Sequence, residues 1–475
     1  MFRIFLITLL CLSNNTIFSQ KTVKIDEFIS NSEKSIEDLK MAKFASLNKN
    51  EDRLFRKGFL PNVALNFTFP AYNRSISEVA QPDGTFEFRE SNSANSRVIL
   101  SLSQKIPLTG GKITISNSLN RLDLFGSQRS TSYSASWFGI NFSQSLTFFN
   151  DMKWEEKIQE ARYNYNNVIY LQKRIEIKKT AINYYFELIK FKNQTALLNA
   201  EWNSASKYKK VISNLISAGK RLPYDSIDVE LKILDLNRSQ VFLKKGELLK
   251  IKSINSFFNS DFLNDSDNLL LPGLAFDLQN ADVYIERYLE VHEILRLNNL
   301  TGLQKELKQL ESSKYYSANL ALGVGFNNTA DHYQYIYQNP NQSQNFTISL
   351  SVPLLDFGKR KTEYEISKAK YEIESINLDQ DKRDSIEKIN LLSQEIADYY
   401  DALKIEKSRA DLLQKKLRIM EALLFSQKIL YSEYSDIERS VYETNMDIMN
   451  ITEGIYNKIT ELEKITLLEI IKNDN

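Results

Sequence analysis

Residue types that could support catalysis or bind a metal are scarce in this chain and widely separated. Its 475 residues include two histidines, His292 and His332, and one cysteine, Cys11. Zinc clusters, Cys–His nucleophiles and disulfides each need several such side chains close together, so the composition argues against all three. We therefore expect a protein that is not an enzyme and that uses no metal or cofactor.

Two short motifs that could suggest chemistry have simpler structural explanations. Asp225 and Asp228 lie at a predicted helix start, where acidic side chains offset the positive end of the helix dipole. Gly323 and Gly325 form a Gly-X-Gly motif inside a strand-like segment, without the strand–loop–helix context of a phosphate site. We interpret the first pair as helix-start residues and the second as small strand residues.

The charge balance argues against a nucleic-acid partner, and the N-terminus predicts export. Lys and Arg total 61 while Asp and Glu total 60, so there is no basic excess to bind phosphates. Arg3, the apolar run Ile4–Leu12 and a small Ser19 match a secretory signal peptide at residues 1–19, which would remove Cys11. Beyond it, no apolar run approaches the roughly 18–20 residues of a spanning helix. The exported chain is thus expected to be soluble, lipid-anchored or embedded through β-strands.

Proline positions leave long segments that can be helical. The stretches 108–222, 224–271 and 354–475 contain no proline, and an interior proline costs a helix about 3 kcal/mol. In the last stretch, steps of three, four and seven predict a coiled-coil seam along Ile386, Ile389, Ile396, Tyr400 and Leu403. We predict helices at 22–58, 151–218, 223–259, 280–314, 357–431 and 434–472.

Period-two alternation predicts β-strands between these helices, each with one apolar and one small-polar face. The pattern occurs in 63–69, 98–106, 138–148, 320–326 and 346–354, and less clearly in 113–124. A membrane barrel fits this pattern, and so does a soluble sandwich. In a barrel, the lipid-facing residues of the last two strands would be Leu320, Leu322, Val324, Phe346, Ile348 and Leu350. The polar stretches 72–96 and 327–345 are predicted to be extracellular loops.

The chain also resembles itself at long range. Residues 140–163 align with 348–371, and the pairs Tyr184–Tyr185 and Tyr399–Tyr400 align further on and are expected to pack helices. This predicts two repeats, each with the order helix, strands, long helix, returning helix. The first is 20–279, with strands at 60–148 and coiled-coil helices at 151–259 before a linker; the second is 280–475, with strands at 317–354 and helices at 357–472.

Residues 349–372, SLSVPLLDFGKRKTEYEISKAKYE, resemble the strand-to-helix junction of TolC-family outer-membrane efflux proteins. The resemblance is carried by Pro353, Leu354, Asp356 and Gly358, followed by basic residues that open a helix. The tyrosine pairs and the turn within 216–230 extend it over nearly the whole chain after the signal peptide. It implies a mainly α-helical protein with a β membrane region, in which a trimer shares one β-barrel that continues as a periplasmic α-helical barrel.

The first half departs from this family pattern. It has Ser145 and Asn150 where the second half has Pro353 and Gly358, and it carries an extra hairpin around Gly110-Gly111. The family usually contributes four strands per subunit. The sequence leaves four or six open here, depending on whether the added pair joins the barrel.

The resemblance implies a passive exit duct for tripartite efflux or type I secretion. It would lie in the outer membrane of a Gram-negative bacterium, with a large periplasmic part. Its partners would be two further copies of the chain, outer-membrane lipid, a periplasmic adaptor (membrane fusion) protein and an inner-membrane transporter. Such a duct does no chemistry on its cargo, so drug, metal and protein export all fit. The alternative is an exported coiled-coil scaffold protein that forms no channel.

In this family the adaptor docks at two helical turns far from the membrane. Gly219 suits a helix C-cap and Pro223 the first turn of the next helix, and chain reversal alone explains both equally well. A turn does not require the apolar Leu222, so we expect it to contact a partner. By position, the predicted docking residues are Ala218, Gly219, Lys220, Arg221 and Leu222 in the first half and Tyr431, Ser432, Glu433, Tyr434 and Ser435 in the second.

Overall fold

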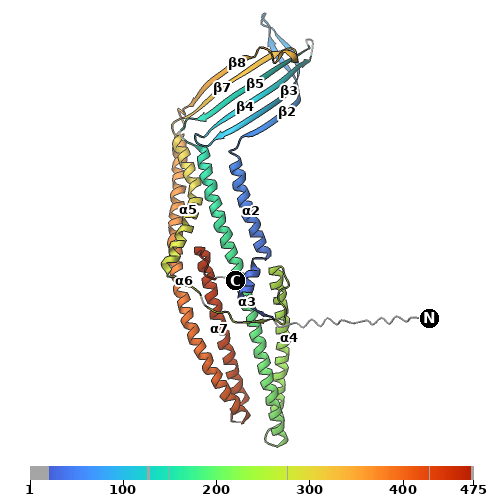
Figure 1. Ribbon diagram of the computed structural model, residues 1–475, viewed down its shortest axis with the longest axis vertical. Helices are drawn as coiled ribbons and strands as arrows, with labels where there is room; N and C mark the ends of the chain where they lie inside the picture. Colours follow the sequence, from blue (N-terminus) through green and yellow to red (C-terminus); the bar gives the residue numbers. More distant parts are fainter. Residues whose placement is uncertain (1–20, 126–128, 148, 275, 427, 472–475) are drawn as a thin grey trace, which may run out of the picture. The chain divides into compact units, whose positions relative to one another are not determined.

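The computed structural model describes residues 21–125, 129–147, 149–274, 276–426 and 428–471 (Figure 1). The predicted signal peptide, with Cys11, lies outside them. The chain divides into two compact units, and each takes segments from both predicted repeats. The first unit comprises Met1–Phe44, Val168–Val291 and Asp384–Asn475; the second comprises Ala45–Asn167 and His292–Arg383.

The described residues form seven α-helices whose order repeats along the chain. They are α1 (Ile25–Ser32), α2 (Ile36–Lys57), α3 (Asp151–Ser217), α4 (Tyr224–Phe258), α5 (Ala281–Ser312), α6 (Lys359–Phe425) and α7 (Tyr431–Thr466). The long helices α3 and α6 have 67 residues each, and the returning helices α4 and α7 have 35 and 36. Among the described helices, none is both long and apolar enough to cross a membrane.

Three of the predicted helices differ from the structure in their bounds. The single helix predicted at 22–58 is instead the short strand β1 (Thr22–Val23), then α1 and α2. The break occurs because the Ser35 hydroxyl accepts the Asp38 N–H at 3.1 Å and so caps a new helix. The helix predicted at 357–431 ends at Phe425, and α7 begins at Tyr431 rather than at 434.

One antiparallel sheet of six strands lies wholly within the second unit. Figure 1 shows its strands side by side, in the order β2-β3-β4-β5-β7-β8. Their bounds are β2 (Asn62–Ala80), β3 (Phe86–Ile106), β4 (Gly111–Phe125), β5 (Ser130–Ser145), β7 (Ser317–Ala330) and β8 (Asn341–Ser351). The added pair β3 and β4 therefore sits inside the sheet, which has six strands from this one chain.

The predicted loops are shorter than expected. Residues 72–96 mostly continue β2 and β3, which pair from Tyr72 with Ala94 as far as Ala80 with Phe86 and leave a turn at 81–85. Residues 327–345 are also partly strand, because β7 runs to Ala330 and β8 begins at Asn341. Alternation fails as a guide in the first hairpin because polar side chains occupy both faces there.

The core of the first unit includes the buried Tyr185 and the half-buried Tyr400. The Tyr185 hydroxyl donates to the Leu270 carbonyl at 2.6 Å, and the Tyr400 hydroxyl donates to the Leu274 carbonyl at 3.0 Å. Tyr185 is buried in the same apolar cluster as Ile182 and Phe186. The predicted packing role of these tyrosines is confirmed, and they also hold the segment that links α4 to α5.

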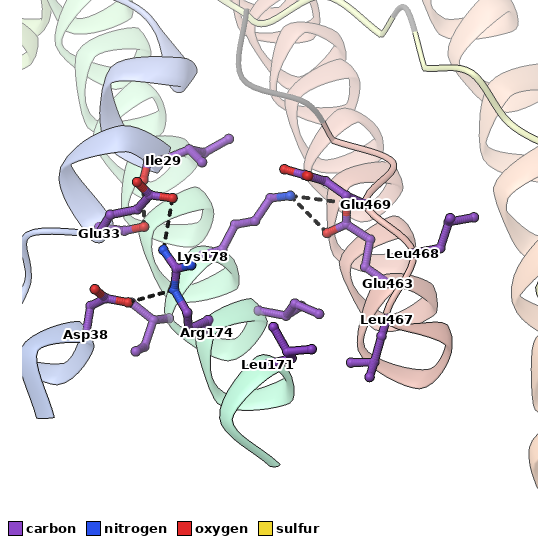
Figure 2. A pocket seen from close by; sticks show the side chains of 13 residues that line it. Ile29, Glu33, Asp38, Leu171, Arg174, Lys178, Glu463, Leu467, Leu468 and Glu469 are labelled. Atoms are coloured by element: carbon purple, nitrogen blue, oxygen red, sulfur yellow. Dashed lines mark hydrogen bonds and ion pairs between the residues drawn. The ribbon is translucent and has the colours of Figure 1, made fainter. Parts of the chain in front are cut away.

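A charged cavity of about 220 Å³ lies in this unit between α1, α2, α3 and α7 (Figure 2). The buried Glu463 carboxylate accepts bonds from Lys178 Nζ at 3.0 Å and from the Ile470 and Ile471 N–H groups at 2.7 Å. Arg174 pairs with Glu33 and Asp38 on the other side of the cavity. These pairs fasten the segment after α7 and the start of α2, so the cavity is part of the scaffold.

Candidate channel wall, junctions and helical turns

The apolar face of the sheet is continuous across strands. Directly paired residues share a face, and the register pairs Leu320 with Ile348 and Leu322 with Phe346. Leu322 also pairs with Phe142 on β5. Ile348 is 55% exposed and Leu350 64% exposed. All six residues predicted to share this face lie on it, although Val324 pairs with the polar Gln344. So large an exposed apolar surface marks an interaction with a membrane or a partner.

The opposite face of the sheet carries small and polar residues. Gly139 of β5 lies directly across from Gly325 of β7, and Asn141 lies across from Gly323. A Cβ atom added at Gly325 would lie 2.6 Å from the Phe138 carbonyl oxygen, which is closer than real side chains come. The Gly-X-Gly motif consists of strand residues, as interpreted from the sequence, and the close strand packing at Gly325 explains why they are small.

The second strand-to-helix junction lies at the residues that carry the family resemblance. The Asp356 carboxylate accepts the N–H groups of Gly358 at 3.0 Å and Arg360 at 3.4 Å. Gly358 has a φ of +83°, which glycine adopts without strain. Pro353 and Leu354 follow the end of β8; Pro353 is half-buried and Leu354 is exposed. The junction thus ends the strand and starts α6 within a few residues.

At the first strand-to-helix junction, one residue caps the helix. It is Asn150, which the sequence marked only as a departure from the family pattern. Asn150 Oδ1 accepts the Lys153 N–H at 3.1 Å, which caps α3. Asn150 Nδ2 donates to the Pro107 carbonyl at 2.7 Å and the Leu108 carbonyl at 3.2 Å. Asn150 therefore ties the turn of the added β3–β4 hairpin to the start of α3. The sequence could have indicated the capping role, because an asparagine directly before a predicted helix is a common N-cap.

The first helical turn lies where it was predicted. Gly219 has a φ of +68°. The Gly219 N–H donates to the Ile216 carbonyl, and the Lys220 N–H donates to the Leu215 carbonyl. These two bonds form the Schellman pattern that ends α3. The Leu222 N–H donates to the Asp225 carboxylate at 3.3 Å, which begins α4. The Leu222 side chain remains 61% exposed at the apex.

The second helical turn differs from its prediction. Tyr431, Ser432, Glu433, Tyr434 and Ser435 form the first turn of α7, whereas the connection itself is 426–430. Glu433 accepts the Leu430 N–H at 3.3 Å and so fixes the helix start. Tyr431 stacks on Tyr208 of α3 with ring centroids 4.9 Å apart, and Tyr434 is buried, whereas Ser432 and Glu433 are exposed.

Glu438, in α7 just after this second turn, has a buried carboxyl group. Glu438 is 7% exposed and accepts the Ser204 hydroxyl at 3.0 Å. Burial, helped by the nearby Glu201 carboxylate, raises the pKa of Glu438, because both disfavour the charged form. In the described residues no group of three or more His, Cys, Asp or Glu side chains is arranged to hold a metal.

Comparisons with known proteins find the fold in solved structures only. No family model and no curated protein matches the sequence. The outer-membrane channel OprN aligns with a TM-score of 0.66 at 12% identity, covering 93% of this chain and 89% of its own. The outer-membrane protein VceC of Vibrio cholerae gives 0.65 at 9% identity, covering 93% and 95%. The Campylobacter jejuni outer-membrane channel CmeC gives 0.62 at 11% identity, covering 93% and 85%. The chain thus has the fold of TolC-family outer-membrane efflux channels, as its junction residues indicated.

Proposed function

We propose that this chain is a subunit of an outer-membrane channel that serves as a passive exit duct. The observation that carries the proposal is the six-stranded sheet, whose apolar face is exposed while its other face is small and polar. In water, exposure of that apolar face costs roughly 25 cal/mol per Å². A lipid environment removes the cost, and the fold shared with outer-membrane channels supports that environment.

The two edge strands of the sheet would need to pair with further copies of the chain. β2 and β8 are its two outer strands, and an open edge in lipid leaves backbone N–H and C=O groups without partners. Pairing β8 of one copy with β2 of the next would close a barrel. In a homotrimer, six strands from each of three copies would make eighteen.

Exposed apolar residues on the helices support the same assembly. Ile405, Leu412 and Ile419 of α6 are exposed and follow one another at steps of seven. Ile227, Leu234 and Val241 of α4 do the same. A seven-residue repeat keeps one seam toward a neighbouring helix. Packing against adjacent copies would form the α-helical barrel.

The proposed duct would be energised from outside itself, by an inner-membrane transporter acting through a periplasmic adaptor. Both efflux and type I secretion use this arrangement in the family. We propose docking at the turns, with Leu222 as the contact. Leu222→Asp should abolish crosslinking to the adaptor while trimer abundance stays normal. Unchanged crosslinking and transport would place docking elsewhere.

Membrane extraction tests the channel assignment directly. A barrel subunit stays in the outer-membrane fraction after carbonate and high-salt washes, and detergent releases it as a trimer. A coiled-coil scaffold would leave the membrane in the washes. Recovery of the chain in the wash, as a monomer, would contradict the proposed function and support the scaffold.

A further inference from the structure

The added β3–β4 pair carries charges on the small-polar face of the sheet. On β3, alternation from Ser101 places Arg97 and Lys105 on that face. On β4, Lys112 pairs directly with Lys105 and with Ser143 of β5, so it shares the face. All three basic side chains are exposed.

The rest of this face is uncharged over the same stretch. On the other strands, we consider the residues of this face that pair, strand by strand, with the stretch of β3 from Arg97 to Lys105. Apart from Lys112 and the bulges, they are Asn, Ser, Thr, Ala and Gly. Arg97 itself lies between Thr68 and Asn120. Within the part of the chain that the structure describes, no ion pair joins Arg97, Lys105 or Lys112 to an acidic residue.

The pairing of Lys105 with Lys112 is unfavourable for the sheet alone. Like charges directly opposite each other on neighbouring strands destabilise the pair. Lys105 offsets part of that cost by lying 5.6 Å from the centre of the Phe59 ring. An acidic residue on either strand would have removed the repulsion. Lys105 and Lys112, without an acidic neighbour, form a surface that can attract anions.

The barrel of the proposed function would turn this face toward its lumen, and this inference rests on that function. We propose that Arg97, Lys105 and Lys112 form a cationic zone that makes the barrel favour anionic solutes over cations. Three copies would repeat each residue around the wall. Like charges lining a water-filled passage with low-dielectric walls raise the local concentration of counter-ions. The added hairpin would thus supply the selectivity of the pore as well as two more strands.

The test is the reversal potential of the purified trimer in a planar bilayer with unequal KCl concentrations on the two sides. Neutralising all three residues (Arg97→Gln, Lys105→Gln, Lys112→Gln) should lower the chloride-to-potassium permeability ratio by about two-fold or more, because the wall loses its positive potential. The charge-reversing pair Lys105→Glu and Lys112→Glu should lower it further.

The matched control is Arg121→Gln, which removes a positive charge from the apolar-face side of the same strand β4. Arg121 pairs with Ser96 and Tyr133 and forms an ion pair with Asp123 at 2.9 Å. This control should leave the permeability ratio unchanged. An unchanged ratio in the triple variant would overturn the inference while leaving the channel in place. A trimer that never conducts would instead refute the proposed function.

Discussion

The two units of this protein use the same apolar residue types in opposite ways. In the first unit, Ile182 and Phe186 are fully buried among helices. In the second, Ile348 and Phe346 lie exposed on a sheet face that no other described segment covers. The first unit can therefore fold on the hydrophobic effect in water. Exposed apolar residues on the sheet are poorly solvated by water, which is the physical reason for proposing that lipid covers them.

The largest expected effect lies in the buried unit. Phe186→Ala should destabilise it by about 3–5 kcal/mol, because the change removes a buried ring and leaves a cavity. Thermal unfolding of the detergent-extracted protein, followed by circular dichroism of the helices, would measure the loss. An unchanged melting temperature would mean that this cluster is not the core of the unit.

A somewhat smaller effect is expected on the exposed sheet face. Ile348→Arg should cost about 2–4 kcal/mol, since a charge on the lipid face of a barrel is poorly solvated. The amount of assembled trimer in membranes should fall. Ser349→Arg is the matched control on the neighbouring, opposite face. Normal assembly of Ile348→Arg together with a harmful Ser349→Arg would invert the assignment of the two faces.

The junctions should respond more weakly. Asn150→Ala should cost about 1–2 kcal/mol, because it removes the α3 cap and the bonds to the β3–β4 turn together. Asn150→Asp keeps the acceptor that caps α3 but loses the donor to the Pro107 carbonyl. Its stability should therefore lie between those of the wild type and Asn150→Ala. Proteolysis at the turn near Gly110 would report the loosening. Equal protease resistance in all three proteins would show that Asn150 does not hold the turn.

The smallest effect concerns pH and the buried Glu438. Its pKa is raised by burial, so the folded protein binds a proton that the unfolded chain has already released at intermediate pH. The free energy of unfolding therefore declines as pH rises from the usual carboxyl pKa to that of the folded protein. Glu438→Gln should remove this decline. A wild-type protein with the same pH dependence as Glu438→Gln would contradict it.

Much of this structure follows from local patterns in the sequence. Alternation located the six strands, and proline-free stretches located the long helices. Alternation missed the outer half of the first hairpin, because Tyr72–Ala80 pairs with β3 while carrying polar residues on both faces. The connection at 426–430 contains no glycine or proline to mark it. The double role of Asn150 depends on a turn more than 40 residues away, which local reasoning does not reach.

In the proposed channel, the small-polar face of the sheet lines a water-filled lumen while the apolar face meets lipid. The only cysteine lies in the predicted signal peptide, so single cysteines can be placed without background. The measurement is the trimer current in a bilayer during treatment with a charged, water-soluble thiol reagent. Ser349→Cys should be modified and lose current, and its neighbour Ile348→Cys should stay unmodified. Modification of both at equal rates, or of Ile348→Cys alone, would contradict the account.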